Sequence, residues 1–143
     1  MVKREIELHI PTYLYKYLTI QYDIEDKVVL SNKFIFNMPS NSHNVGKYFE
    51  KNKANGKSII LEMWNPSTRK GYAFCKAMER EFNKALINFT DGYVRAGAAA
   101  KEAVELFLDI YEITEYDFKF ETAYKKWVRR DKEYHKPVPV LHG

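Results

Sequence analysis

The N-terminal part of the chain begins with a strand-like pattern of apolar and polar residues. Over Glu5–Ile10, apolar Ile6, Leu8 and Ile10 alternate with polar residues, and this period of two predicts a half-buried strand. Helical spacing of apolar residues then predicts a short helix over Thr12–Tyr22. The β-branched and aromatic content of that segment leaves a strand as the alternative.

Further strands are predicted where Val, Leu, Ile and Phe concentrate in short runs, at Lys27–Ser31, Lys33–Asn37 and Ser58–Met63. Ser58–Met63 is the most apolar and should be buried. The composition of Met38–Asn44 predicts a loop, and Gly46–Asn55 suggests a helical turn followed by a Lys/Asn/Gly turn.

The second half of the chain has a helical period. Apolar residues recur every three or four positions over Tyr72–Phe89, which predicts a long amphipathic helix that breaks or kinks at Asp91-Gly92. Ala98–Tyr111 predicts a second helix. The fold class is therefore α+β: a small N-terminal mixed sheet (1–66), then a helical part (70–134) and an extended tail (135–143), together forming one compact unit.

A third helix is predicted after Thr114, because Thr114 and Asp117 have capping-box spacing with Asp in place of Glu. Its apolar residues fall at i, i+3, i+4, i+7 and i+8 and form one stripe, made of Phe120, Ala123, Tyr124, Trp127 and Val128. Its remaining faces carry basic residues: Lys125, Lys126, Arg129, Arg130 and Lys132. We expect Trp127 to be buried against the Ala98–Tyr111 helix.

The net charge of +4 is concentrated in this segment. Lys125–Lys136 contains six basic and two acidic residues, so the rest of the chain is neutral. Such asymmetry indicates a polyanionic partner more strongly than the overall charge does.

The helix at Ala98–Tyr111, a turn near Ile113–Thr114 and the basic helix together resemble the helix-turn-helix of DNA-binding proteins of phages and mobile elements, over residues 98–132. The resemblance implies that the second helix lies in the major groove of DNA. It also implies a set of nucleic-acid-binding residues: Thr122, Lys125, Lys126, Arg129, Arg130 and Lys132. The alternatives are a solvated helix face and a surface for an acidic protein or a membrane.

Catalytic and metal-binding patterns are missing from the sequence. The four histidines lack metal-ligand spacing, and the single cysteine, Cys75, lies among apolar residues as a small buried side chain would. No phosphate loop or nucleophile elbow occurs. We therefore predict no enzyme activity, no catalytic residue, no metal and no cofactor.

The chain begins without a signal peptide and contains no apolar run of about 18 residues, so we expect a soluble protein without membrane partners. It would act in the cytoplasm, or in a virion if the protein is viral. The predicted function is nucleic-acid binding, chiefly of duplex DNA, by an accessory or regulatory protein that forms a homo-oligomer. The alternative is a structural assembly protein, such as a viral particle subunit, whose Pro-Val-Pro-Val tail exchanges with neighbours.

Overall fold

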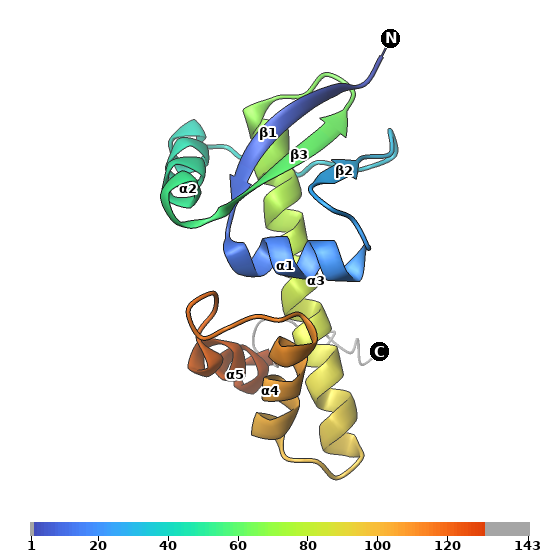
Figure 1. Cartoon of the computed structure of the whole chain (residues 1–143), viewed down its shortest axis with the longest axis vertical. Coiled ribbons are helices and arrows are strands. Elements are labelled where there is room, and N and C mark those ends of the chain that lie inside the picture. Colours follow the sequence, from blue (N-terminus) through green and yellow to red (C-terminus); the bar gives the residue numbers. More distant parts are fainter. Residues whose placement is uncertain (1, 131–143) are drawn as a thin grey trace, which may run out of the picture. The chain divides into compact units, whose positions relative to one another are not determined.

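The computed structural model describes residues 2–130 and shows an α+β fold, as predicted (Figure 1). A small mixed sheet at the N-terminus is followed by helices. In chain order the elements are β1 (Arg4–Ile10), α1 (Thr12–Gln21), β2 (Lys27–Val29), α2 (Ser42–Asn55), β3 (Lys57–Met63), α3 (Thr68–Arg95), α4 (Ala100–Ile110) and α5 (Phe120–Val128).

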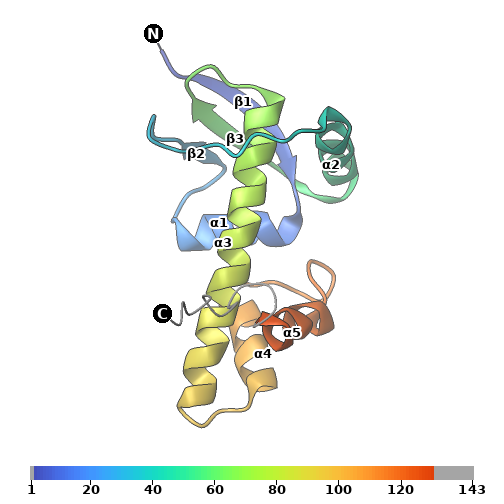
Figure 2. The same ribbon diagram turned by 180° about the vertical axis from the view of Figure 1, so that it is seen from behind.

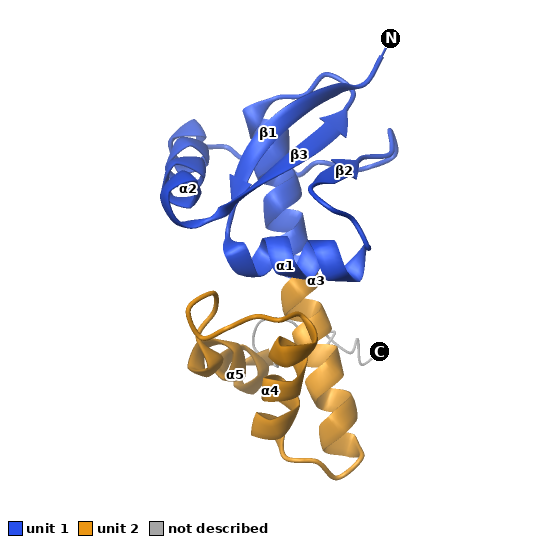
Figure 3. Ribbon diagram, in the orientation of Figure 1, with its two compact units in different colours: residues 1–80 blue, residues 81–143 orange. Residues whose placement is uncertain are grey.

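The chain divides into two compact units, residues 1–80 and 81–143 (Figure 3). The division falls inside α3, so one continuous helix contributes to both units, whereas the sequence placed the boundary between residues 66 and 70.

Unit 1 is built on a three-stranded sheet in which β3 is central, antiparallel to β1 and parallel to β2. Leu8 pairs with Ile59, so the alternation of both strands places their buried residues on one face. The first half of α3 runs across this face (Figure 2), where Gly71 comes so close to Leu8 that a Cβ atom would lie 2.7 Å from its side chain. The alternating pattern therefore predicted the core face of the sheet.

Two segments of unit 1 differ from the sequence-based expectation. Lys33–Asn37 is not a strand: its Phe34 ring instead packs 5.7 Å from Phe74 of α3. Helix α2 is much longer than the expected single turn. It begins after Asn41, whose side chain accepts a hydrogen bond from the His43 N–H at 2.9 Å, and thus inside the segment expected to be a loop.

A partly buried polar cluster joins α2 and α3 in unit 1. The Tyr48 hydroxyl donates to the Glu79 carboxylate at 2.8 Å, and the Lys76 ammonium lies 3.4 Å from the same carboxylate. Cys75 is buried on the adjacent turn of α3, as expected. Burial and the nearby Glu79 charge raise the pKa of the Cys75 thiol to about 12, and burial raises the pKa of Tyr48 as well.

Unit 2 consists, within the described residues, of the second half of α3 with α4 and α5 around an aromatic core. Phe107 of α4 is central to it: its ring centroid lies 5.5 Å from those of Phe82 and Phe89 on α3. Phe82 also contacts Phe118, in the connection before α5, at 5.5 Å. The helical period of the sequence predicted the two helices, and the structure shows which of their rings meet.

The predicted break at Asp91-Gly92 is wrong, because α3 continues through it to Arg95. A glycine inside a long helix costs only about 1 kcal/mol, which neighbouring contacts can offset. Gly97, two residues after Arg95, terminates the helix, because its φ of 98° is the left-handed conformation of a Schellman motif. The Ala98 N–H donates to the Tyr93 carbonyl and the Gly97 N–H to the Val94 carbonyl, at 2.9 and 3.0 Å.

The raised pKa of Cys75 predicts an unreactive thiol. At about pH 9 roughly half of an ordinary thiol is ionised, but only about one part in a thousand is at a pKa of about 12. Iodoacetamide should therefore alkylate the native protein at least about a hundredfold more slowly than the urea-unfolded chain. Comparable rates would contradict the burial of Cys75.

Candidate nucleic-acid interface

The helix that carries the predicted binding residues begins later than the sequence suggested. The Thr114 N–H does donate to the Asp117 carboxylate, at 3.0 Å, as in the second half of a capping box. This interaction closes only a turn, and α5 starts at Phe120. The connection from α4 to α5 is therefore Tyr111–Lys119, longer than the three- or four-residue turn of a helix-turn-helix.

Both ends of this connection have defined hydrogen bonds. Helix α4 ends in a second Schellman motif, with Glu112 at φ 57° and the Ile113 N–H donating to the Leu108 carbonyl at 2.9 Å. At the start of α5, Lys119 has no acceptor atom in its side chain, and the Glu115 carboxylate accepts the Phe120 N–H at 2.9 Å instead. Glu115 thus fixes where α5 begins.

Four of the predicted binding residues share one exposed side of α5. Thr122, Lys125, Lys126 and Arg129 follow the i, i+3, i+4, i+7 spacing and line a shallow depression of about 160 Å³, which we call the basic face. Lys125 pairs with Glu121 one turn earlier at 3.3 Å, an exposed pair that contributes little to stability. The structure therefore brings these four side chains together on a surface that solvent reaches.

The opposite side of α5 packs on its own unit. Ala123 is fully buried, and the Tyr124 ring lies beneath the Lys101 ammonium of α4, 5.6 Å from its centroid. Trp127 is half-buried rather than buried, and its indole N–H donates to Asp91 of α3 at 2.8 Å. Val128 departs from the predicted apolar stripe, since 51% of it is exposed.

Arg130 does not belong to the basic face. Its Nε lies 3.0 Å from the Asp91 carboxylate, and its guanidinium lies 4.0 Å from the Trp127 ring centroid. The side chains of Arg130 and Asp91 are only 25% and 23% exposed. Arg130 thus neutralises a carboxylate of α3 and holds the C-terminal end of α5 against that helix. Lys132, the sixth predicted residue, lies outside the described residues, as does the tail at 135–143.

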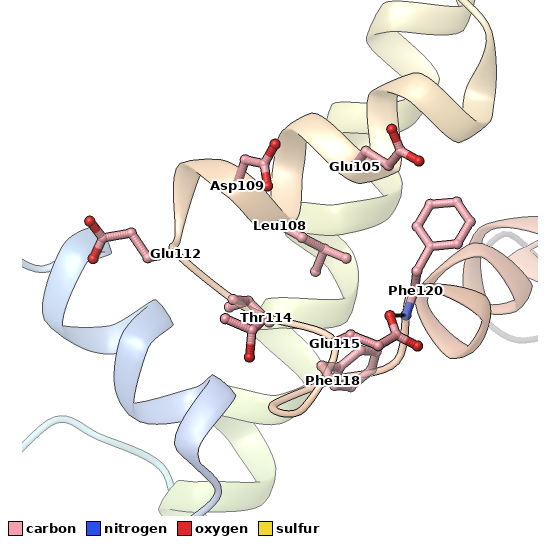
Figure 4. A pocket seen from close by; sticks show the side chains of 9 residues that line it. Glu105, Leu108, Asp109, Glu112, Thr114, Glu115, Phe118 and Phe120 are labelled. Carbon is pink, nitrogen blue, oxygen red and sulfur yellow. Dashed lines mark hydrogen bonds between the residues drawn. The ribbon is translucent and has the colours of Figure 1, made fainter.

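The sequence interpretation missed an acidic groove in unit 2. Glu105, Asp109, Glu112 and Glu115 border a cavity of about 670 Å³ whose floor is apolar (Figure 4). A signal was available, because Glu102–Glu121 contains seven acidic residues and one basic residue. This segment is not apparent from the net charge of the residues outside Lys125–Lys136, which sums to zero.

Residues 2–130 contain no group of three or more His, Cys, Asp and Glu side chains placed to hold a metal ion. None of the described helices is long and apolar enough to cross a membrane. Comparison with known protein families, with curated proteins and with solved structures finds no match to this chain. The resemblance to helix-turn-helix proteins therefore remains a prediction.

The different surroundings of two neighbouring arginines predict opposite mutational behaviour. Arg130→Ala removes a charged hydrogen bond and a cation–π contact from a partly buried site and should cost about 1–2 kcal/mol. Arg129→Ala, which removes the same charge from an exposed position, should cost less than about 0.5 kcal/mol. Urea unfolding of the two variants measures the difference.

An Asp91→Ala variant completes a double-mutant cycle with Arg130→Ala. A coupling energy on the order of 1 kcal/mol between them is expected from the contact. Equal stability of the two arginine variants, together with zero coupling, would show that Arg130 is merely surface charge.

Proposed function

We propose that the protein binds nucleic acid, and duplex DNA in particular, through the basic face of α5. The observation that carries the proposal is the presence of Lys125, Lys126 and Arg129 on one exposed side of a single helix, beside the Thr122 hydroxyl. Exposed cations grouped in this way neutralise phosphates and release condensed counterions, which is the main source of affinity for a nucleic-acid backbone.

The position of the charges along α5 favours contacts to phosphates over contacts to bases. Glu115 and Glu121 occupy the N-terminal end of the helix, and the cations occupy its C-terminal half. A recognition helix usually reads bases with its N-terminal residues. In this protein those positions are acidic, so the C-terminal half would approach the backbone and position the protein on the duplex.

From the resemblance of residues 98–132 to helix-turn-helix proteins we propose an accessory or regulatory protein of the phage or mobile-element type that acts in the cytoplasm. The position of the charges implies that it depends on further contacts for sequence preference. Arg130 contributes indirectly in this proposal, because it holds α5 in place through Asp91 and Trp127. In the alternative interpretation the basic residues are a solvated helix face that only complements the helix dipole. That interpretation predicts negligible affinity for nucleic acid at every salt concentration.

Salt dependence tests the proposal. With three cations on phosphates, log affinity for duplex DNA should fall against log salt with a slope of roughly −3. Arg129→Ala should reduce the magnitude of the slope by about 1 and weaken all duplex sequences alike. The triple variant Lys125→Ala/Lys126→Ala/Arg129→Ala should bind poorly at any salt concentration. Fluorescence anisotropy with labelled duplex, single-stranded DNA and RNA provides the measurement.

A matched control removes the same charge elsewhere in unit 2. Lys84 is exposed on α3 and is not part of the basic face, so Lys84→Ala should leave affinity within about twofold of the parent. If Lys84→Ala and Arg129→Ala weaken binding equally, only overall charge matters and the basic face is not the interface. Tighter binding of RNA than of duplex DNA would change the assigned partner.

A further inference from the structure

The acidic groove of unit 2 has the form of a docking site for a cationic helix. Glu105 and Asp109 lie one turn apart on α4, and Leu108 lies between them on the floor (Figure 4). Phe118 and Phe120 form the other side. An apolar floor bordered by carboxylates accepts a ligand that offers an aliphatic side chain flanked by positive charges. The same carboxylates repel nucleic acid.

A surface of this chemistry is present on the same protein. Val128 of α5 is 51% exposed, although a valine gains nothing from contact with water or with phosphates. It follows Lys125 by three residues and precedes Arg129, so Lys125 lies one turn before both and the three side chains form a patch at the edge of the basic face. Lys125 and Arg129 are separated by one turn, about 6 Å along the axis, as are Glu105 and Asp109.

We propose that the acidic groove of one molecule receives α5 of a second copy. Val128 packs on the rings of Phe118 and Phe120 beside the nearly buried Leu108, while Lys125 and Arg129 pair with Glu105 and Asp109. The two surfaces are different patches of one chain, so the contact is heterologous. An assembly that does not close into a ring therefore has one unoccupied groove at one end and one unoccupied α5 at the other. The copies therefore join head to tail into rings or chains.

Sedimentation velocity over a range of protein concentrations at low and high salt tests this interface. The parent protein should associate at low salt, and added salt should weaken the association because exposed charge pairs are screened. Two charge-reversed proteins, Glu105→Lys/Asp109→Lys and Lys125→Glu/Arg129→Glu, should each remain monomeric. Mixing them restores opposite charges at both contacts and should restore association.

A third variant probes the apolar part of the contact. Val128→Ser should weaken association at least about tenfold, because it removes the packing on the floor while leaving every charge in place. Circular dichroism verifies that each variant is folded. A parent protein that stays monomeric at all concentrations, or two folded charge-reversed proteins that stay monomeric when mixed, would overturn the proposal. Association of either charge-reversed protein alone at the parent's level would overturn it too.

The outcome is separable from that of the proposed nucleic-acid function. Glu105→Lys/Asp109→Lys and Val128→Ser keep Lys125, Lys126 and Arg129, so both should bind duplex DNA even though they no longer associate. If no variant binds nucleic acid but the charge-reversed pair associates on mixing, the interface stands and the nucleic-acid proposal fails. If duplex DNA binds but the mixture stays monomeric, only the interface is rejected.

Discussion

The continuity of α3 is the constraint on which the structure depends. Its 28 residues extend about 42 Å, and its apolar side supplies Phe74 and Cys75 to one core and Phe82 and Leu86 to the other. Because the helix does not break at Gly92, Asp91 is presented from a regular helical turn. Its carboxylate can then accept the Trp127 indole N–H and pair with Arg130.

That single carboxylate separates the cations of α5 into two groups. Arg130 pairs with Asp91 on the side of α5 that packs against α3. Lys125, Lys126 and Arg129 lie on the basic face, which is open to solvent. Nucleic acid and the acidic groove of a second copy would compete for this outer surface. Binding to a duplex would therefore release a molecule from its neighbour, and free protein would be held in associated form.

Much of the fold could be predicted from local pattern. Period-two alternation identified β1, a short apolar run identified β3, and helical period identified most of α3 and α4. The helix ends were harder. Gly97 is the residue expected at a Schellman turn, but the corresponding position after α4 is Glu112, which no sequence rule marks. The length of helix α2 was underestimated because it buries little beyond Val45 and Asn52 and so lacks a strong apolar period.

The candidate site could also be predicted only in part, because one of its features depends on a contact between residues far apart in the sequence. Lys125, Lys126 and Arg129 follow from the spacing of the apolar stripe. Arg129 and Arg130, in contrast, are adjacent and chemically identical in the sequence. Their roles differ because of Asp91, which precedes Trp127 by 36 residues and reaches it only through tertiary packing. Long-range pairing of this kind cannot be read from helical period.

The separation of charge within unit 2 has a consequence for how fast partners meet. Glu102–Glu121 is strongly acidic and Lys125–Arg130 is strongly basic, so opposite charges are concentrated in two separate segments of the unit. In the field of a polyanion, charges separated in this way would turn the basic segment forward before contact. If nucleic acid is bound as proposed, productive collisions would then form a larger share of all encounters, and ionic strength would control the association rate constant as well as the affinity.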